Sequence, residues 1–182
     1  MKGIVFTEFL EMVEQTFSPE LADRLLDQTE LSSGGAYTAV GTYSHQELVA
    51  LVTQLSEFTQ MSVSALIQAF GEHLFGRFAL GYPHFFANIH NATDFLVSIE
   101  NVIHVEVHKL YPDAELPRFT VEARTADRLV LIYSSPRGFG DLALGLIRAC
   151  VAYYKENWRI QRTDLSGPTQ VRFTLERGDG KQ

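Results

Sequence analysis

The sequence predicts an α+β fold: a helical N-terminal part, about residues 1–112, precedes a four-stranded antiparallel sheet with one inserted helix, about residues 113–182. The first part repeats apolar residues with the period of a helix, whereas the second contains short alternating segments rich in β-branched residues. The 182 residues, 46% of them hydrophobic, suffice for one buried core, and no internal repeat divides them. We therefore expect a single domain over residues 1–182.

Four amphipathic helices are predicted before residue 83, in the order of the chain. The first covers residues 4–17, and Pro19 stands at the first position of the second. Ser44 is a capping residue for the third. The fourth ends before Pro83, and its Gly71 allows a neighbouring element or a ligand to approach closely.

A fifth helix is predicted from the apolar positions between Phe95 and Leu110. Either Thr93 or Asp94 is expected to cap its start, and Pro112 follows its end. The pattern covers more than four turns, so it outweighs a short stretch of strand-like alternation within it.

The second part reads as two hairpins with a helix between them. Residues 118–124 and 129–134 alternate like paired strands around a polar turn, and residues 158–162 and 170–176 form the second pair. Residues 139–156 return to helical spacing.

Composition restricts the classes of partner. The net charge of −7 and the lack of a basic run argue against nucleic acid or an anionic membrane, which both attract clustered Lys and Arg. Cys150 is the single cysteine, so an intrachain disulfide is impossible and a cysteine-based zinc site lacks its ligands. Acidic residues interrupt the N-terminal apolar stretch, and no segment is long enough to span a bilayer. A cytoplasmic location is expected.

His104 and His108 are the first candidates for a functional role. As a strand, this segment would place His104, Glu106 and His108 on one face, as a comb for a metal ion. As a helix, His104 lies on the apolar face and His108 one turn further on. A metal site would need a third protein ligand, and otherwise His104 is a buried, hydrogen-bonded histidine and His108 a surface one.

A second cluster lies at the end of a predicted strand. Alternate residues of an extended chain face the same way, so Tyr133, Ser135 and Arg137 present two hydroxyls and a guanidinium together. Such a group suits carboxylates or phosphates, because Arg forms bidentate, charge-assisted hydrogen bonds. The alternative is a strand end with a solvated Arg. Together with one imidazole and many Phe and Leu side chains, the cluster meets the needs of a haem: an axial ligand, propionate partners and a flat apolar pocket.

The sequence resembles the haem nitric oxide/oxygen-binding family, H-NOX, which is similar to the haem domain of soluble guanylate cyclase. The resemblance covers nearly the whole chain, and Tyr133-x-Ser135-x-Arg137 is its most specific motif. The other matching segments are Met1 to Val5, Gly35 to Tyr43, Phe70-Gly71, His104 to Pro112, and Pro117.

The resemblance implies a cofactor, haem b (iron protoporphyrin IX), with His104 as the proximal iron ligand. It implies that Tyr133, Ser135 and Arg137 bind the propionates and that Pro117 presses on the porphyrin. His108 has no ligand counterpart in the family. The positions that match the pocket wall are Val5, Phe9, Leu74, Phe78, Leu142 and Leu146.

The resemblance also implies a gas sensor rather than an enzyme. Oxygen-binding members place a tyrosine at the position of Leu142 and an asparagine at that of Leu74, so the apolar pair predicts nitric oxide binding with discrimination against oxygen. Carbon monoxide is expected to bind as well. Release of His104 would carry the signal to a separate protein, a histidine kinase or a cyclic-di-GMP enzyme in similar bacterial domains. Two other readings are a His-based non-haem metalloenzyme and a carrier or store of haem.

Overall fold

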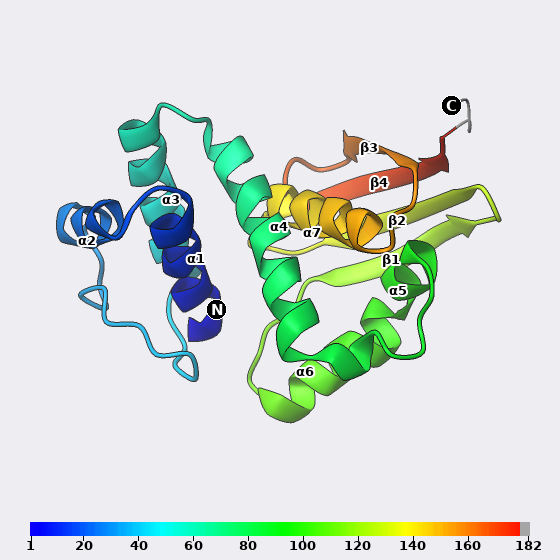
Figure 1. Cartoon of the computed structure of the whole chain (residues 1–182), viewed down its shortest axis with the longest axis horizontal. Helices are drawn as coiled ribbons and strands as arrows, with labels where there is room; N and C mark the ends of the chain where they lie inside the picture. The colour runs from blue at the N-terminus through cyan, green and yellow to red at the C-terminus, as the bar shows by residue number, and fades with distance from the viewer. Residues whose placement is uncertain (179–182) are drawn as a thin grey trace.

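The computed structural model describes residues 1–178 and has an N-terminal group of helices beside a sheet with its own helices (Figure 1). Helix α1 (Gly3–Thr16) and α2 (Pro19–Gln28) pack with α3 (His45–Thr59), and the long α4 (Val63–Gly81) runs between the two groups. The predicted capping residue of the third helix is confirmed, because the Ser44 hydroxyl accepts a hydrogen bond from the Gln46 amide.

The sheet contains β1 (Arg118–Arg124), β2 (Arg128–Ser134), β3 (Trp158–Asp164) and β4 (Gln170–Arg177), all antiparallel, in the order β1-β2-β4-β3. The two predicted hairpins are therefore joined through the β2–β4 pair into one sheet. Helix α7 (Gly140–Tyr153) lies against one face and connects the hairpins (Figure 1). The α+β class is confirmed.

Helices α4 and α7 cross in direct backbone contact at two glycines. A Cβ atom on Gly71 would lie 2.4 Å from the Leu142 carbonyl oxygen, and one on Gly145 would lie 2.1 Å from that of Gln68. Only glycine, which has no Cβ atom, permits the two backbones to approach this closely. Gly71 therefore has the packing role that the sequence suggested for it.

The predicted fifth helix is helical throughout but contains a break in hydrogen-bond register. It consists of α5 (Ala92–Ser98), a π-helix (Ile99–Ile103) and α6 (His104–Leu110). The predicted cap was wrong: Asn91, rather than Thr93 or Asp94, stands at the N-cap, because its side-chain oxygen accepts from the Asp94 amide at 2.8 Å. A short 3-10 helix, Pro83–Phe85, precedes this segment.

Two hydrophobic cores form. The N-terminal core is built from α1, α2, α3 and the first half of α4, with Phe6, Phe9 and Phe70 among its fully buried side chains. The sheet core lies between the sheet, α5, α7 and the second half of α4, around Phe173 and Ile147. Each core buries the apolar surface of its own group of elements, and α4 contributes side chains to both.

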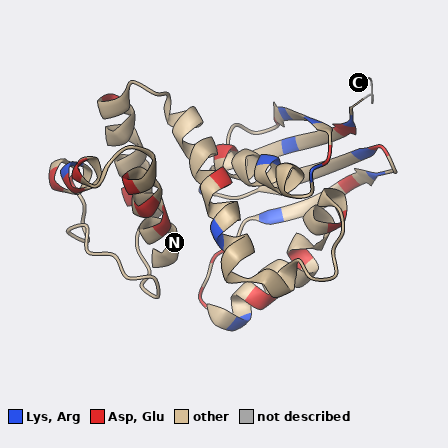
Figure 2. Cartoon of the chain, in the orientation of Figure 1, with Lys and Arg blue, Asp and Glu red and all other residues tan. Residues whose placement is uncertain are grey.

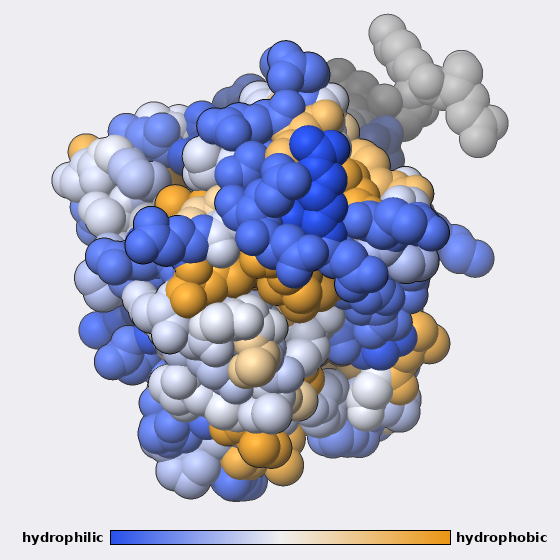
Figure 3. Space-filling view, turned by 90° about the vertical axis from the view of Figure 1, so that its left-hand side faces the viewer, coloured by the Kyte–Doolittle hydropathy of each residue, from blue (hydrophilic) through white to orange (hydrophobic). Residues whose placement is uncertain are grey.

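The N-terminal helices and the rest of the chain also differ in net charge. Nine acidic and two basic side chains lie in residues 1–62, which therefore carry the whole net charge of −7, while the remaining residues balance. Acidic residues, coloured red, are visible along α1 and α2 in Figure 2. Figure 3 views the molecule from the side of these helices, where hydrophobic patches alternate with hydrophilic ones. Within residues 1–178, no helix is both long and apolar enough to cross a membrane.

Candidate functional site

A cavity of about 280 Å³ lies between the N-terminal helices and the sheet. Its walls come from the start of α1, the second half of α4, the segment from α5 to β1, the end of β2, and α7. This volume is near the lower end of the range of about 300–1,000 Å³ found for small-molecule and cofactor sites. The cavity is the candidate site.

Ten of the eleven side chains predicted for the site line this cavity: His104, Tyr133, Ser135, Arg137, Pro117, Val5, Leu74, Phe78, Leu142 and Leu146. Phe9 is not among the lining residues. It is completely buried in the N-terminal core, where its ring meets Phe70 at a centroid distance of 5.3 Å. Phe9 therefore supports the wall from behind instead of forming it.

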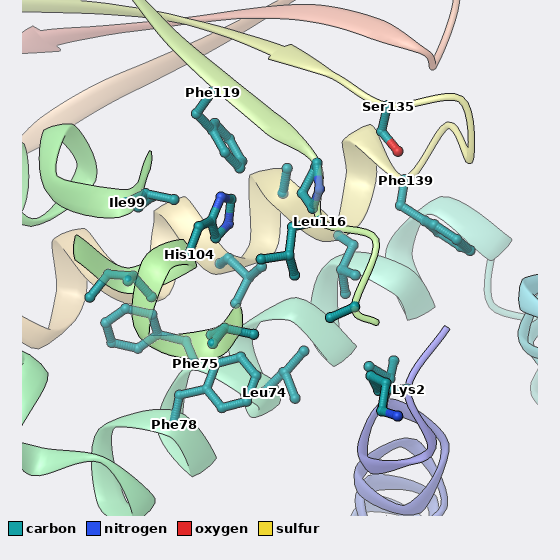
Figure 4. Close-up of a pocket in the computed structure, with 18 of the residues that line it drawn as sticks. Lys2, Leu74, Phe75, Phe78, Ile99, His104, Leu116, Phe119, Ser135 and Phe139 are labelled. Atoms are coloured by element: carbon teal, nitrogen blue, oxygen red, sulfur yellow. The ribbon is translucent and has the colours of Figure 1, made fainter. Parts of the chain in front are cut away.

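His104 begins α6, directly after the π-helix, and its ring points into the cavity below Phe119 of β1 (Figure 4). Its Nδ1 lies 3.1 Å from the Glu100 carboxylate. Burial lowers the pKa of His104 below its ordinary value, although Glu100 acts in the opposite direction. A neutral ring that donates through Nδ1 leaves the Nε2 lone pair free, which is the form that binds a metal.

Tyr133, Ser135 and Arg137 come together at the end of β2, as alternation predicted. The Tyr133 hydroxyl accepts a hydrogen bond from the Phe139 amide at 3.1 Å. Burial raises the pKa of Tyr133 above its ordinary value, with hydrogen bonds from its neighbours opposing the change, so the phenol stays protonated and can donate. Two hydroxyls and a guanidinium therefore face one side of the cavity.

The Arg137 guanidinium already has a carboxylate partner. It donates to the Glu115 backbone oxygen at 2.9 Å and is hydrogen-bonded to the Glu115 carboxylate. The Glu115 side chain is 81% exposed, whereas that of Arg137 is only 16% exposed. The Glu115 carboxylate thus has the chemistry of a propionate, and it shows that this guanidinium accommodates such a group.

The opposite wall is apolar. All cavity-lining residues from α1, α4 and α7 are hydrophobic apart from the Cys150 thiol; they are Ile4, Val5, Leu74, Phe75, Phe78, Leu142, Ala143, Leu146 and Ile147. The His104 imidazole and the Tyr133, Ser135 and Arg137 group come from α6 and from the sheet side instead. The other polar lining residues are Lys2, Tyr82, Tyr111 and Glu115. The cavity therefore fits a flat apolar group with an iron ligand on one face and an anionic edge.

The comb of metal ligands on one strand face does not form. Because the segment is helical, the exposed His108 lies one turn beyond His104 instead of beside it. Across residues 1–178 no group of three or more His, Cys, Asp or Glu side chains is placed to hold a metal ion. The non-haem metal site thus lacks its ligand set.

The sequence interpretation missed two acidic residues and an aromatic wall. Glu100 lies four residues before His104, a helical spacing that could have revealed it, whereas the contact of Glu115 with Arg137 depends on tertiary structure. Phe75, Phe86 and Phe95 line the cavity, and the Phe75 ring packs edge to face against the other two. Cys150 also lines it, and burial raises its thiol pKa, so it is a poor nucleophile.

Comparisons with known proteins agree with this geometry. The sequence profile of the Haem-NO-binding family matches residues 2–162. A search of curated proteins found no match. Among solved structures, the unliganded Fe(II) H-NOX protein from K. algicida has 39% identity and a TM-score of 0.93, with 100% of this chain and 99% of that chain covered.

Two further structures extend the likeness to ligand-bound proteins. The H-NOX protein from Shewanella woodyi, solved with IWP-051 in the Fe(II)CO state, has 41% identity and a TM-score of 0.85, covering 100% of this chain and 97% of that chain. The S. oneidensis H-NOX protein in the Fe(II)NO state has 25% identity and a TM-score of 0.89, covering 98% and 100%. This chain therefore belongs to the Haem-NO-binding, or H-NOX, family, whose domains bind haem and sense gases.

Proposed function

We propose that this chain is a single-domain sensor of nitric oxide that binds haem b through His104 and discriminates against oxygen. When bound, haem would supply a ferrous iron that can bind a diatomic gas, and His104 would be its protein ligand. The observation that carries the proposal is one largely buried, neutral imidazole that lines the same cavity as a hydrophobic wall.

The apolar wall accounts for the proposed selectivity. Bound oxygen is polar and is stabilised by a hydrogen-bond donor, whereas nitric oxide binds ferrous iron strongly without one. Leu74 and Leu142 offer no such donor. The related proteins solved with nitric oxide or carbon monoxide support binding of both gases here.

Cofactor retention is assigned to the polar side of the cavity. Arg137 would exchange the Glu115 carboxylate for a propionate, and the protonated Tyr133 and Ser135 hydroxyls would add hydrogen bonds to that edge. Pro117 lines the cavity beside Leu116 and would restrict the shape that a bound porphyrin can adopt.

The output is proposed to be a change in a partner protein and not a reaction on a substrate. Release of His104 would free α6 to shift against the sheet, and a partner responds only if it binds the two arrangements with different affinity. A histidine kinase or a cyclic-di-GMP enzyme is the proposed partner. A pure carrier of haem would leave the activity of such a partner unchanged by nitric oxide.

The ligand assignment is tested with His104→Gly, using His108→Ala as the matched control one turn away. The parent and the control are expected to show the same Soret band and ferrous spectrum when supplied with haem. The glycine variant should lose this spectrum and recover it when imidazole is added to fill the vacated space. An unchanged spectrum in His104→Gly would refute the assignment.

Selectivity is tested by exposing the reduced, haem-loaded protein to air and to nitric oxide. The parent should bind nitric oxide and form no stable oxygen complex. The double variant Leu74→Asn/Leu142→Tyr, which supplies a supported donor on the apolar wall, should gain oxygen affinity. A stable oxygen complex of the parent would contradict the role given to the two leucines.

A further inference from the structure

Glu100 occupies a special position in the segment that carries His104. It is the second residue of the π-helix Ile99–Ile103, in which the His104 amide donates to the Ile99 carbonyl, five residues earlier. A π-helix inserts one extra residue into the helical turn and so redirects the side chains around it. In this turn, the Glu100 and His104 side chains face one another, with Nδ1 of the imidazole 3.1 Å from Oε1 of the carboxylate.

The same carboxylate oxygen has a second partner, on the sheet. The Phe119 amide donates to Glu100 Oε1 at 2.6 Å. Since β1 is an edge strand, some of its amides point away from β2, and that of Phe119 is satisfied by Glu100. The Phe119 ring also lies beside His104, at a centroid distance of 6.2 Å. One atom of Glu100 thus joins the histidine to the start of β1.

The negative charge of Glu100 acts mainly on this imidazole. Among the described residues, the ion pairs of Glu100 include no Lys or Arg, and His104 is its one paired side chain. The Glu100 side chain is 33% exposed and that of His104 15% exposed, so the contact is partly shielded from water. A carboxylate that accepts from one ring nitrogen fixes the tautomer and makes the other nitrogen a stronger donor.

We infer that Glu100 is a positioning residue that sets the tautomer, the orientation and the donor strength of His104 and couples His104 to β1 through the Phe119 amide. The iron-ligand part of this inference rests on the proposed function, whereas the tautomer and the Phe119 contact do not. Movement of the segment that carries His104 would then be transmitted to β1 through Oε1 of Glu100, which both groups share.

The inference is tested with Glu100→Ala and Glu100→Gln, and with Glu106→Gln as the matched control. Glu106 lies on α6 and pairs with Lys109, away from the imidazole. Gln retains an oxygen that can accept both hydrogen bonds, so this variant keeps the local fold while removing the charge. Ala removes the acceptor altogether.

The first measurement uses haem-free protein. Nitrogen chemical shifts of the His104 ring should report an Nδ1–H tautomer in the parent and in Glu100→Gln, and a mixture in Glu100→Ala. Exchange of the Phe119 amide should become about tenfold faster in Glu100→Ala, because a hydrogen bond to a charged group is lost. Glu106→Gln should match the parent in both. A Glu100→Ala protein with parental tautomer and exchange rate would overturn the inference.

The second measurement uses haem-loaded, reduced protein. The iron–histidine stretching frequency should fall in Glu100→Gln, fall further in Glu100→Ala, and stay constant in Glu106→Gln. Equal frequencies in all four proteins would overturn the role in donor strength. Failure of the parent to bind haem would instead refute the proposed function, and the haem-free measurements would still decide whether Glu100 positions His104.

Discussion

The N-terminal helices and the sheet region differ in charge, in packing and in what they give to the cavity. Residues 1–62 carry the whole net charge of −7, and their core is separate from that of the sheet. They supply only the edge of the cavity, at Met1, Lys2, Ile4 and Val5. The sheet region supplies His104 and the Tyr133, Ser135 and Arg137 group.

The difference shows which parts of the cavity are held by one core and which are shared between the two. The polar groups that would bind the cofactor belong to one packed unit, so their mutual geometry is fixed by the sheet core. The opposite edge belongs to another unit, and α4 contributes to both cores. Because α4 packs into both cores and touches α7 at Gly71 and Gly145, it is the element that connects the two sides of the cavity.

The largest effect is expected at that crossing. Gly145→Ala should lower the free energy of unfolding by about 3 kcal/mol, because the new methyl group would overlap the Gln68 carbonyl and force α4 and α7 apart. Gly76→Ala in the same α4 helix is the control. Apart from its chain neighbours and the adjoining backbone of α4, no described atom lies within 4 Å of the added methyl, and a gain of about 0.5–1 kcal/mol is expected. Equal denaturant midpoints for the two variants would show that the crossing is not tightly packed.

The next effect lies within the N-terminal unit. Glu47 is only 6% exposed and accepts hydrogen bonds from Ser32, from the Ser33 amide and hydroxyl, and from the Tyr37 hydroxyl. Glu47→Gln should cost about 2 kcal/mol at pH 7, since a charged acceptor that receives several hydrogen bonds is replaced by a neutral amide. Glu57→Gln, an exposed position on the same helix, should have no measurable cost.

The pH dependence of Glu47 sharpens this prediction. Burial alone would raise the pKa of Glu47, but the hydrogen bonds from Ser32, Ser33 and Tyr37 lower it below its ordinary value of 4.5. A carboxylate with a lowered pKa in the folded state stabilises the protein at pH values above its ordinary pKa. This contribution to the free energy of unfolding is lost as the pH falls through the lowered pKa. The stability difference between the parent and Glu47→Gln should therefore shrink below pH 4.5 in urea titrations. A difference independent of pH would contradict the charge argument.

A smaller effect is expected for the cofactor edge. Arg137→Ala should raise haem loss about tenfold, because a hydrogen bond between charged groups contributes about 1.5–3 kcal/mol and the neighbouring hydroxyls retain part of it. Glu115→Gln removes the competing carboxylate and should slow haem loss. Transfer of haem to an acceptor protein measures both, with the exposed Arg148→Ala as control. An unchanged rate of haem transfer in Arg137→Ala would show that the guanidinium does not contribute to haem binding.

The smallest effect is expected for the ion pair that bridges the two units at the surface. Lys2 Nζ lies 3.2 Å from both Asp113 oxygens and 3.0 Å from the Thr42 hydroxyl. Lys2 holds the pKa of the exposed Asp113 below its ordinary value, yet solvent and salt screen such pairs. Asp113→Asn should leave the denaturant midpoint nearly unchanged at low and high salt. A shift as large as that of Glu47→Gln would mean that this contact, and not α4, joins the units.

Much of this structure could be predicted because its signals are local. Helical periodicity, Ser44 as a cap and strand alternation act within a few residues, so the α+β class, both hairpins and the grouping of Tyr133, Ser135 and Arg137 could be predicted from the sequence. The limits of local signals are also visible. Asn91 was overlooked as a cap because Thr93 and Asp94, two and three residues later, carry equally suitable side chains.

Other features were decided by tertiary structure alone. A 3.6-residue pattern does not distinguish a continuous helix from one interrupted by a π-turn, so the π-helix Ile99–Ile103 and the contact of Glu100 with the Phe119 amide could not be predicted, although the four-residue spacing of Glu100 and His104 is visible in the sequence. The β2–β4 pairing, the burial of Phe9 away from the cavity and the Glu115–Arg137 contact depend on elements distant in the chain. The sequence by itself determined the chemical groups and their local spacing. Only packing of the two cores against α4 decided which of those groups share a cavity, because such contacts form between residues that no local pattern relates.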